Sequence, residues 1–134
     1  MDFIKYISTP ITYSEDNPLI TTLKLTRGRL TGGFLYFPTG PAGLLHFIAR
    51  IGVHQIVPFN TGDSYRLNDC VIQFHLNINL TEEPFVIDCV TWNDSTLYSH
   101  ALTVCFYLSP RSKRNKEIDD LATYQSLVKG YHKP

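Results

Sequence analysis

The sequence predicts an all-β fold, namely an antiparallel β-sandwich or jelly roll followed by a short C-terminal α-helix. The main observation is the segment Cys70–Leu80, in which apolar and polar residues alternate as in a strand with one buried face. Glycine, proline and polar turns divide the rest into short apolar runs with no helical period between them. The 8 Tyr and 8 Phe also favour sheets, because aromatic residues are enriched in strands.

The first strands follow from alternation and from glycine. Residues 1–17 are predicted to form an N-terminal arm or an edge strand with a loop, and ordered structure is expected from near Leu19. In Leu19–Thr26 one face carries Leu19, Thr21, Leu23 and Leu25 and the other carries Thr22, Lys24 and Thr26, which predicts a core strand. Leu30–Phe37 predicts the next strand, and the glycine pair Gly32-Gly33 inside it indicates a β-bulge or a close approach of two backbones.

Three further apolar segments predict the second half of the sandwich. Leu44–Val57 is the longest, and its alternation and flanking Gly and Pro favour one long strand, broken near Gly52. Phe85–Trp92 and Leu97–Leu108 are predicted to pair as a hairpin across Asn93–Thr96, whose residue types are typical of turns. Together these segments make six to eight strands, enough for two facing sheets.

The composition changes after Leu108, where a C-terminal extension (109–134) begins. With the N-terminal arm (1–17), this leaves a β-sandwich domain at 18–108. The extension begins with a basic tether of Arg111, Lys113, Arg114 and Lys116. Beyond the tether, apolar residues at helical spacing predict an amphipathic helix whose contact face includes Ile118, Leu121 and Val128. So short a helix is marginal alone, so we expect it to dock on the sandwich or on a neighbouring subunit.

The charge content indicates the kind of partner. Only 18% of the residues are charged and the formal net charge is zero, so much of the surface is uncharged. Such a surface resists association poorly, which favours a protein partner or a homo-oligomer, with a trimer favoured. Nucleic acid is not an expected partner, except through the basic tether. No apolar run is long enough for a membrane span, and no secretory signal is recognised, so synthesis in a reducing cytoplasm is expected.

No residue pattern predicts catalysis, a cofactor or a metal site, and the chain is expected not to be an enzyme. The three cysteines lie in strand-like runs without a Cys-x-x-Cys pair, which favours buried thiols. The five histidines lack the paired spacing of metal ligands, although a metal-dependent jelly-roll enzyme stays an alternative. The chain contains no Gly-x-Ser-x-Gly nucleophile motif and no Gly-rich phosphate loop before a helix.

Two sets of residues are candidates for binding. Besides the helix face, candidate protein contacts are outward-facing positions of two predicted strands. They are His46, Ile48, Arg50, Gln73, His75, Asn77 and Asn79. The second set would bind carbohydrate or a receptor, because an aromatic ring beside amide and carboxylate groups can stack on a sugar and hydrogen-bond it. Its members are Trp92, Asn93, Asp94, Asn60 and Asp63.

Four motifs of the sandwich resemble a known group of proteins. They are the turn Phe37-Pro38-Thr39-Gly40-Pro41-Ala42-Gly43-Leu44, the loop Gln55-Ile56-Val57-Pro58-Phe59-Asn60, the pair Trp92-Asn93, and His100. Over roughly residues 30–108 the chain resembles small all-β, jelly-roll-like structural proteins of tailed phages and related viruses, in which such motifs recur. These are turn and packing residues, so the resemblance bears on the fold more than on an activity. The extension 109–134 is not part of the pattern.

The resemblance implies a virion structural component, such as a capsid decoration or cement protein or a minor tail or baseplate subunit, bound to a lattice of capsid or tail subunits. A charge-poor sandwich with terminal arms independently suits symmetric assembly. The alternative is a carbohydrate- or receptor-binding β-sandwich module that uses the Trp92 segment and the Asn60–Asp63 loop.

Overall fold

The computed structural model describes residues 1–110, which are all-β and contain no helix. The eight strands are β1 (Asp2–Thr9), β2 (Leu19–Lys24), β3 (Gly28–Phe37), β4 (Leu45–Ile51), β5 (His54–Val57), β6 (Cys70–Leu80), β7 (Val86–Asn93) and β8 (His100–Ser109). The prediction of β6 from its alternation is confirmed to the residue. The predicted basic tether and C-terminal helix, with Ile118, Leu121 and Val128, lie outside the described residues and stay predictions.

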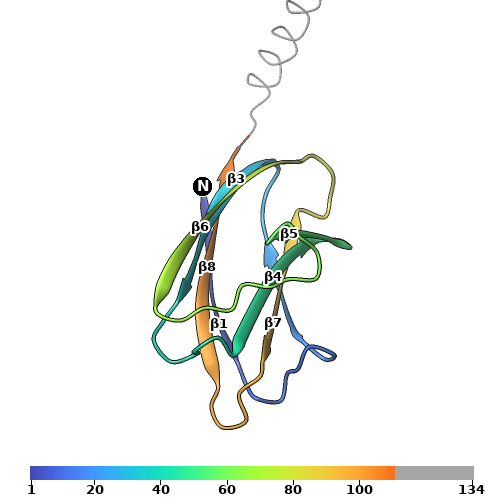
Figure 1. Ribbon diagram of the computed structural model, residues 1–134. Coiled ribbons are helices and arrows are strands. Elements are labelled where there is room, and N and C mark those ends of the chain that lie inside the picture. The colour runs from blue at the N-terminus through green and yellow to red at the C-terminus, as the bar shows by residue number, and fades with distance from the viewer. Residues whose placement is uncertain (111–134) are drawn as a thin grey trace, which may run out of the picture.

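The strands form two antiparallel four-stranded sheets that face each other (Figure 1). The first sheet has the order β1-β8-β3-β6 and the second has the order β2-β7-β4-β5. The first strand thus pairs with the last, β2 with β7, β3 with β6 and β4 with β5. Pairing of β3 with β8 and of β4 with β7 completes the two sheets. The predicted antiparallel sandwich is therefore confirmed as a two-sheet, sandwich-like fold.

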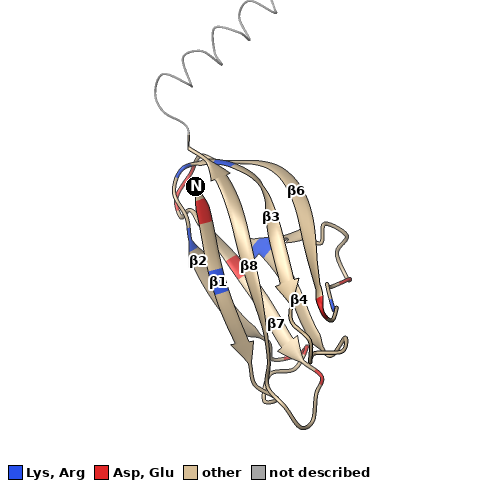
Figure 2. Ribbon diagram, turned by 90° about the vertical axis from the view of Figure 1, so that its left-hand side faces the viewer, with Lys and Arg blue, Asp and Glu red and all other residues tan. Residues whose placement is uncertain are grey.

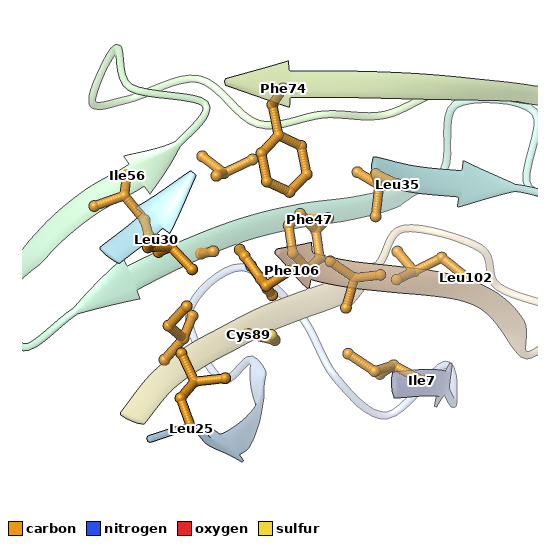
Figure 3. Close-up of a cluster of buried hydrophobic side chains, with 14 of the residues drawn as sticks. Ile7, Leu25, Leu30, Leu35, Phe47, Ile56, Phe74, Cys89, Leu102 and Phe106 are labelled. Carbon is orange, nitrogen blue, oxygen red and sulfur yellow. The ribbon is translucent and has the colours of Figure 1, made fainter. Parts of the chain in front are cut away.

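The core lies between the sheets and is built from the inward-facing half of each alternating strand. In β4, Leu45, Phe47 and Ala49 are fully buried, and in β8 the same holds for Phe106. Phe74 lies on β6 and Phe106 lies on β8, on either side of β3, and their rings pack with centroids 5.4 Å apart (Figure 3). Full burial of one such side chain contributes about 1.5–3 kcal/mol, so this interface is the main source of stability.

The two glycines of β3 explain how the first sheet packs. The register of β3 shifts between Leu30 and Gly32 against both neighbouring strands, so the predicted bulge is confirmed. A Cβ atom on Gly33 would overlap the carbonyl oxygen of Cys105 on β8. The predicted close approach of two backbones is therefore also present, because only a residue without a side chain leaves room for it.

Three sequence predictions about the strands are wrong. Ordered structure begins at Asp2, not near Leu19, because residues 2–9 form the edge strand that was the alternative to an arm. The continuous strand predicted over Leu44–Val57 is wrong, but the break predicted near Gly52 is confirmed: the chain reverses there at a φ of 59°, which suits glycine, and β4 pairs with β5. The strands around Asn93–Thr96 do not form a hairpin, because β7 belongs to the second sheet and β8 to the first. Local turn composition does not distinguish a hairpin from a crossing between sheets.

A buried polar cluster holds the crossing from β7 to β8 in place. Asn93, at the end of β7, donates from Nδ2 to the carbonyl oxygens of Thr9 and Tyr98, each at 2.9 Å, and accepts from the amide of Ser95 through Oδ1. The hydroxyl groups of Thr9 and Thr91 are 2.8 Å apart in the same region. Buried polar groups are costly unless they are paired. The two contacts of Thr9 join the end of β1 to β7, and the bonds of Asn93 to Ser95 and Tyr98 hold the crossing itself.

The three cysteines are free thiols, of which Cys89 and Cys105 are buried as predicted and Cys70 is half-buried. Burial, with a smaller contribution from the neighbouring Asp88 carboxylate, raises the pKa of Cys89 to about 12. Burial and the Asp2 carboxylate likewise raise the pKa of Cys105. These thiols are poor nucleophiles at neutral pH, because the thiolate is the reactive form.

The raised pKa of Cys89 predicts a loss of stability in alkaline solution. In the unfolded chain the thiol ionises near its ordinary value of 9.0, whereas in the folded protein it stays neutral to about pH 12. The contribution is therefore fully present below about pH 9 and is lost as the pH rises towards about 12. We expect the free energy of unfolding to fall by about 1 kcal/mol from pH 9 to pH 10 through this thiol. The free energy of unfolding, measured by urea titration at each pH, should fall less steeply between pH 9 and pH 10 for Cys89→Ala than for Cys70→Ala. An equal pH dependence of the two variants would contradict the assignment.

Candidate interaction surfaces

The outer side of the first sheet carries an apolar surface, which we call the aromatic face. It consists of Ile4, Tyr6, Phe34, Tyr36, Val71 and Tyr107. Tyr6 is 66% exposed, Ile4 62% and Val71 57%, although all three lie within strands. Single exposed apolar residues are common, but a contiguous group on one face is typical of a binding surface.

The strand register shows that the aromatic face is contiguous. Tyr6 lies opposite Thr103, which lies opposite Tyr36, and Tyr36 lies opposite Val71, so this row crosses all four strands. The next row is Ile4, Cys105, Phe34 and Gln73, and the third is Asp2, Tyr107, Gly32 and His75. The rings of Phe34 and Tyr107 connect the second and third rows, with centroids 6.4 Å apart. Neighbouring positions on one face of a sheet lie close enough for direct contact.

The aromatic face has almost no charge. Of the residues in its three rows, Asp2 at the edge of the sheet is the only Asp, Glu, Lys or Arg. Figure 2 shows the same sheet with its charged residues confined to the ends and the outer edge. Where Gly32 leaves a side chain missing, a depression of about 300 Å³ opens between Tyr107, Gln73 and His75. The aromatic face therefore suits a protein partner whose contact surface is uncharged. Binding such a partner would remove no charged side chain at the centre of the face from water.

All four predicted contact positions of β6 are accessible. Gln73, His75, Asn77 and Asn79 are exposed on the outer side of this strand. Gln73 and His75 belong to rows of the aromatic face, whereas Asn79 lies beyond it, opposite Arg29. On β4, Ile48 and Arg50 lie on the outer side of the second sheet and are half-buried. The aromatic face itself was not predicted, although apolar residues on both sides of β1, β3 and β8 were a signal for it.

His46 was predicted as an outward contact, and the structure places it on the outer side of β4 but buries it, with 6% exposed. Its ring stacks on that of Trp92, with centroids 4.8 Å apart and an angle of 13° between the planes. Nδ1 lies 2.7 Å from Ser64 Oγ and Nε2 lies 2.7 Å from Asp94 Oδ2. The expected accessibility of His46 is therefore wrong, because its polar atoms are used to join two loops.

The Ser64, His46 and Asp94 side chains have the composition of a hydrolytic triad, which sequence analysis missed because they lie in three separate segments. In the usual triad the serine contacts Nε2 and the carboxylate contacts Nδ1, whereas here the two are exchanged. These residues line neither the depression beside Gly32 nor the hollow between β5 and β6. The arrangement is better explained as a clamp that fixes the loop after β5 to the crossing between β7 and β8.

The residues predicted to bind a carbohydrate or receptor are largely used inside the protein. Trp92 is 8% exposed beneath His46, and Asn93 is buried in the polar cluster described above, so packing and internal hydrogen bonds leave neither side chain open to a ligand. Asn60 and Asp63 are exposed, but Asn60 Nδ2 donates to Asp63 Oδ2 at 2.6 Å. Their loop is ordered by Gln55, which donates to the carbonyl oxygens of Pro58 and Asp63.

Two properties of the described chain concern metals and membranes. Within residues 1–110, no three His, Cys, Asp or Glu side chains are grouped so that they could hold a metal ion. The same residues include no helix with the length and hydropathy of a membrane span.

Comparisons of the chain with protein-family models, with curated proteins and with solved structures each gave no match.

Proposed function

We propose that this protein is a non-enzymatic structural component of a virion, of the capsid decoration or cement type or a minor tail or baseplate subunit. In this proposal it is synthesised in the host cytoplasm and binds an assembled lattice of protein subunits. The observation that carries the proposal is the aromatic face, an uncharged surface across four strands with exposed Ile and Tyr side chains. A contiguous exposed apolar surface of this kind is typical of a site that a protein partner covers.

The strand order supports a finer description of the fold, which is that the sandwich is a jelly roll. In that fold eight antiparallel strands form two facing sheets, as when one long hairpin is wrapped around a core. The pairing of β1 with β8, β2 with β7, β3 with β6 and β4 with β5 matches this description. Jelly rolls occur in viral capsid proteins, and also in lectins and cupins, so the fold favours the proposal by analogy alone.

The internal use of Trp92 and Asn93 favours structural assembly over the carbohydrate-binding alternative. A sugar platform needs an aromatic ring open to solvent, whereas the Trp92 ring is stacked on His46. The aromatic face is accessible and shows instead the spread of apolar side chains typical of protein–protein contacts.

The proposal predicts that the aromatic face holds the protein on particles. Particles from the source of the protein would be purified on a density gradient, and copies per particle measured by mass spectrometry. We expect a constant stoichiometry for the wild type and a loss of more than about tenfold for Tyr6→Lys with Tyr36→Lys, because each lysine places a charge in the covered surface. Val53→Lys, at a 91% exposed turn position, is the matched control. A wild-type protein that never sediments with particles would refute the proposal.

A further inference from the structure

The four edge strands of the sandwich differ in how they are protected against pairing with another chain. On β1, Lys5 occupies an inward-facing position between Phe3 and Ile7, a placement that opposes the addition of a further strand. On the second sheet, β2 ends in Lys24 and β5 has only four residues. The remaining edge, β6, is the longest strand, with 11 residues and no Lys, Arg, Asp, Glu or Pro. Figure 2 shows β6 uncoloured by charge along most of its length, unlike β1 and β2.

A groove lies directly beside the β6 edge, which has no charged residue or proline and is interrupted only by the register shift against β3 between His75 and Ile78. It has a volume of about 510 Å³ and separates β6 from β5 and the start of the loop that follows β5. Phe74, Leu76 and Ile78 line it from β6, and Ile56 and Phe59 lie across it. Leu76 and Ile78 face inward but are only half-buried, because no strand continues the first sheet beyond β6. The sheet thus has space for one more strand and apolar side chains for it to cover.

We propose that the β6 edges of two copies of this chain pair antiparallel across a two-fold axis, which joins the two first sheets into one continuous sheet. The sequence of β6 is suited to this occupant. With His75 on the axis, Gln73 lies opposite Asn77 of the second copy, and Phe74 lies opposite Leu76 of the second copy. In the same register Ile72 faces Ile78, whereas His75 faces its own copy and Val71 faces Asn79, so no Asp, Glu, Lys or Arg is opposed. The groove accepts the backbone and inward side chains of the added strand.

This pairing goes beyond the proposed function and uses the free edge of β6, which adjoins the aromatic face at Gln73 and His75. The aromatic face binds the lattice in that proposal, whereas the β6 edge joins two copies and leaves most of the aromatic face open. It also gives a dimer, not the trimer that the sequence analysis favours, because an isologous strand pairing closes with two subunits.

The test introduces charged residues on the outer side of β6 and measures the dimer dissociation constant of the full chain by sedimentation equilibrium. Gln73→Lys with Asn77→Lys places lysines opposite each other across the axis, and we expect the dimer dissociation constant to rise more than about 100-fold. Gln73→Glu with Asn77→Glu should do the same. An equal mixture of the two variants should recover a dimer, because lysine then faces glutamate, and this recovery also proves that both variants are folded. Ser8→Lys with Thr26→Lys, two exposed positions away from β6, is the control of equal charge.

The outcomes separate this proposal from the previous one. A wild-type monomer at every accessible concentration, or an oligomer that the lysine pair leaves unchanged, would overturn β6 pairing. The Tyr6→Lys with Tyr36→Lys variant should stay dimeric while it loses particle binding. If that variant instead dissociates the oligomer and the β6 variants do not, the two copies meet through the aromatic face and β6 pairing is wrong.

Discussion

Gly33→Ala is expected to cost more than about 3 kcal/mol of unfolding free energy, the largest effect of any single methyl group in this protein. The added Cβ would overlap the carbonyl oxygen of Cys105 and lie 3.0 Å from the ring of Phe74. The first of these atoms is backbone, held in the pairing of β3 with β8, so it moves only if the sheet itself opens. Because Phe74 comes from β6, the change affects three of the four strands of the first sheet.

The matched control is Gly52→Ala at the turn between β4 and β5. No heavy atom lies within 4 Å of the added Cβ there, and the cost arises from the left-handed φ of 59° alone. We expect a loss of about 1 kcal/mol for this variant. Urea unfolding followed by tryptophan fluorescence gives both values. Equal losses for Gly33→Ala and Gly52→Ala would show that the β3–β8 approach is looser than described.

Asn93→Ala is expected to lower the free energy of unfolding by about 3 kcal/mol, because it leaves three backbone groups, two of them buried, without their side-chain partner. These groups are the carbonyl oxygens of Thr9 and Tyr98 and the amide of Ser95, each 2.9 Å from the Asn93 side chain. The structural change should be confined at first to the end of β1 and the crossing. Hydrogen exchange should show reduced protection of the Ser95 amide, because the end of β1 and the crossing to β8 are no longer joined.

Asn79→Ala provides the comparison for Asn93→Ala, since it removes the same side chain from an exposed position on β6. A change within about 0.5 kcal/mol is expected there. A similarly small change at position 93 would contradict the role assigned to the buried cluster, and would reopen Asn93 as a residue free to bind a ligand.

Alternation predicted the strands well where one face is buried and the other is wet. β6 and β8 have this pattern, and the inward sets Leu102, Val104 and Phe106 are buried as expected. Alternation failed for the partner of each strand, since a period of two says which face is buried and not which strand lies alongside. Hence the Asn93–Thr96 segment was read as a hairpin, when its strands belong to different sheets.

The candidate surfaces were less predictable than the strands, for a related reason. The aromatic face requires apolar residues from four strands to fall on the same outer side, which depends on register. Ser64, His46 and Asp94 likewise meet only because the loop after β5 returns alongside β4. Conversely, Trp92 and Asn93 resemble binding residues in sequence because the same groups that recognise a ligand also satisfy a buried crossing.

The nested order of strand pairing has a consequence for biosynthesis. β1 is made first, but the strand that pairs with it, β8, is made last, and β2 similarly waits for β7. During translation the emerging chain can pair β4 with β5 and then β3 with β6, whereas β7 and β8, which join the remaining strands into the two sheets, are made last. Until then the inward side chains of β1 and β3, such as Ile7, Leu30 and Leu35, have no complete opposing sheet to cover them, which exposes the nascent polypeptide to aggregation.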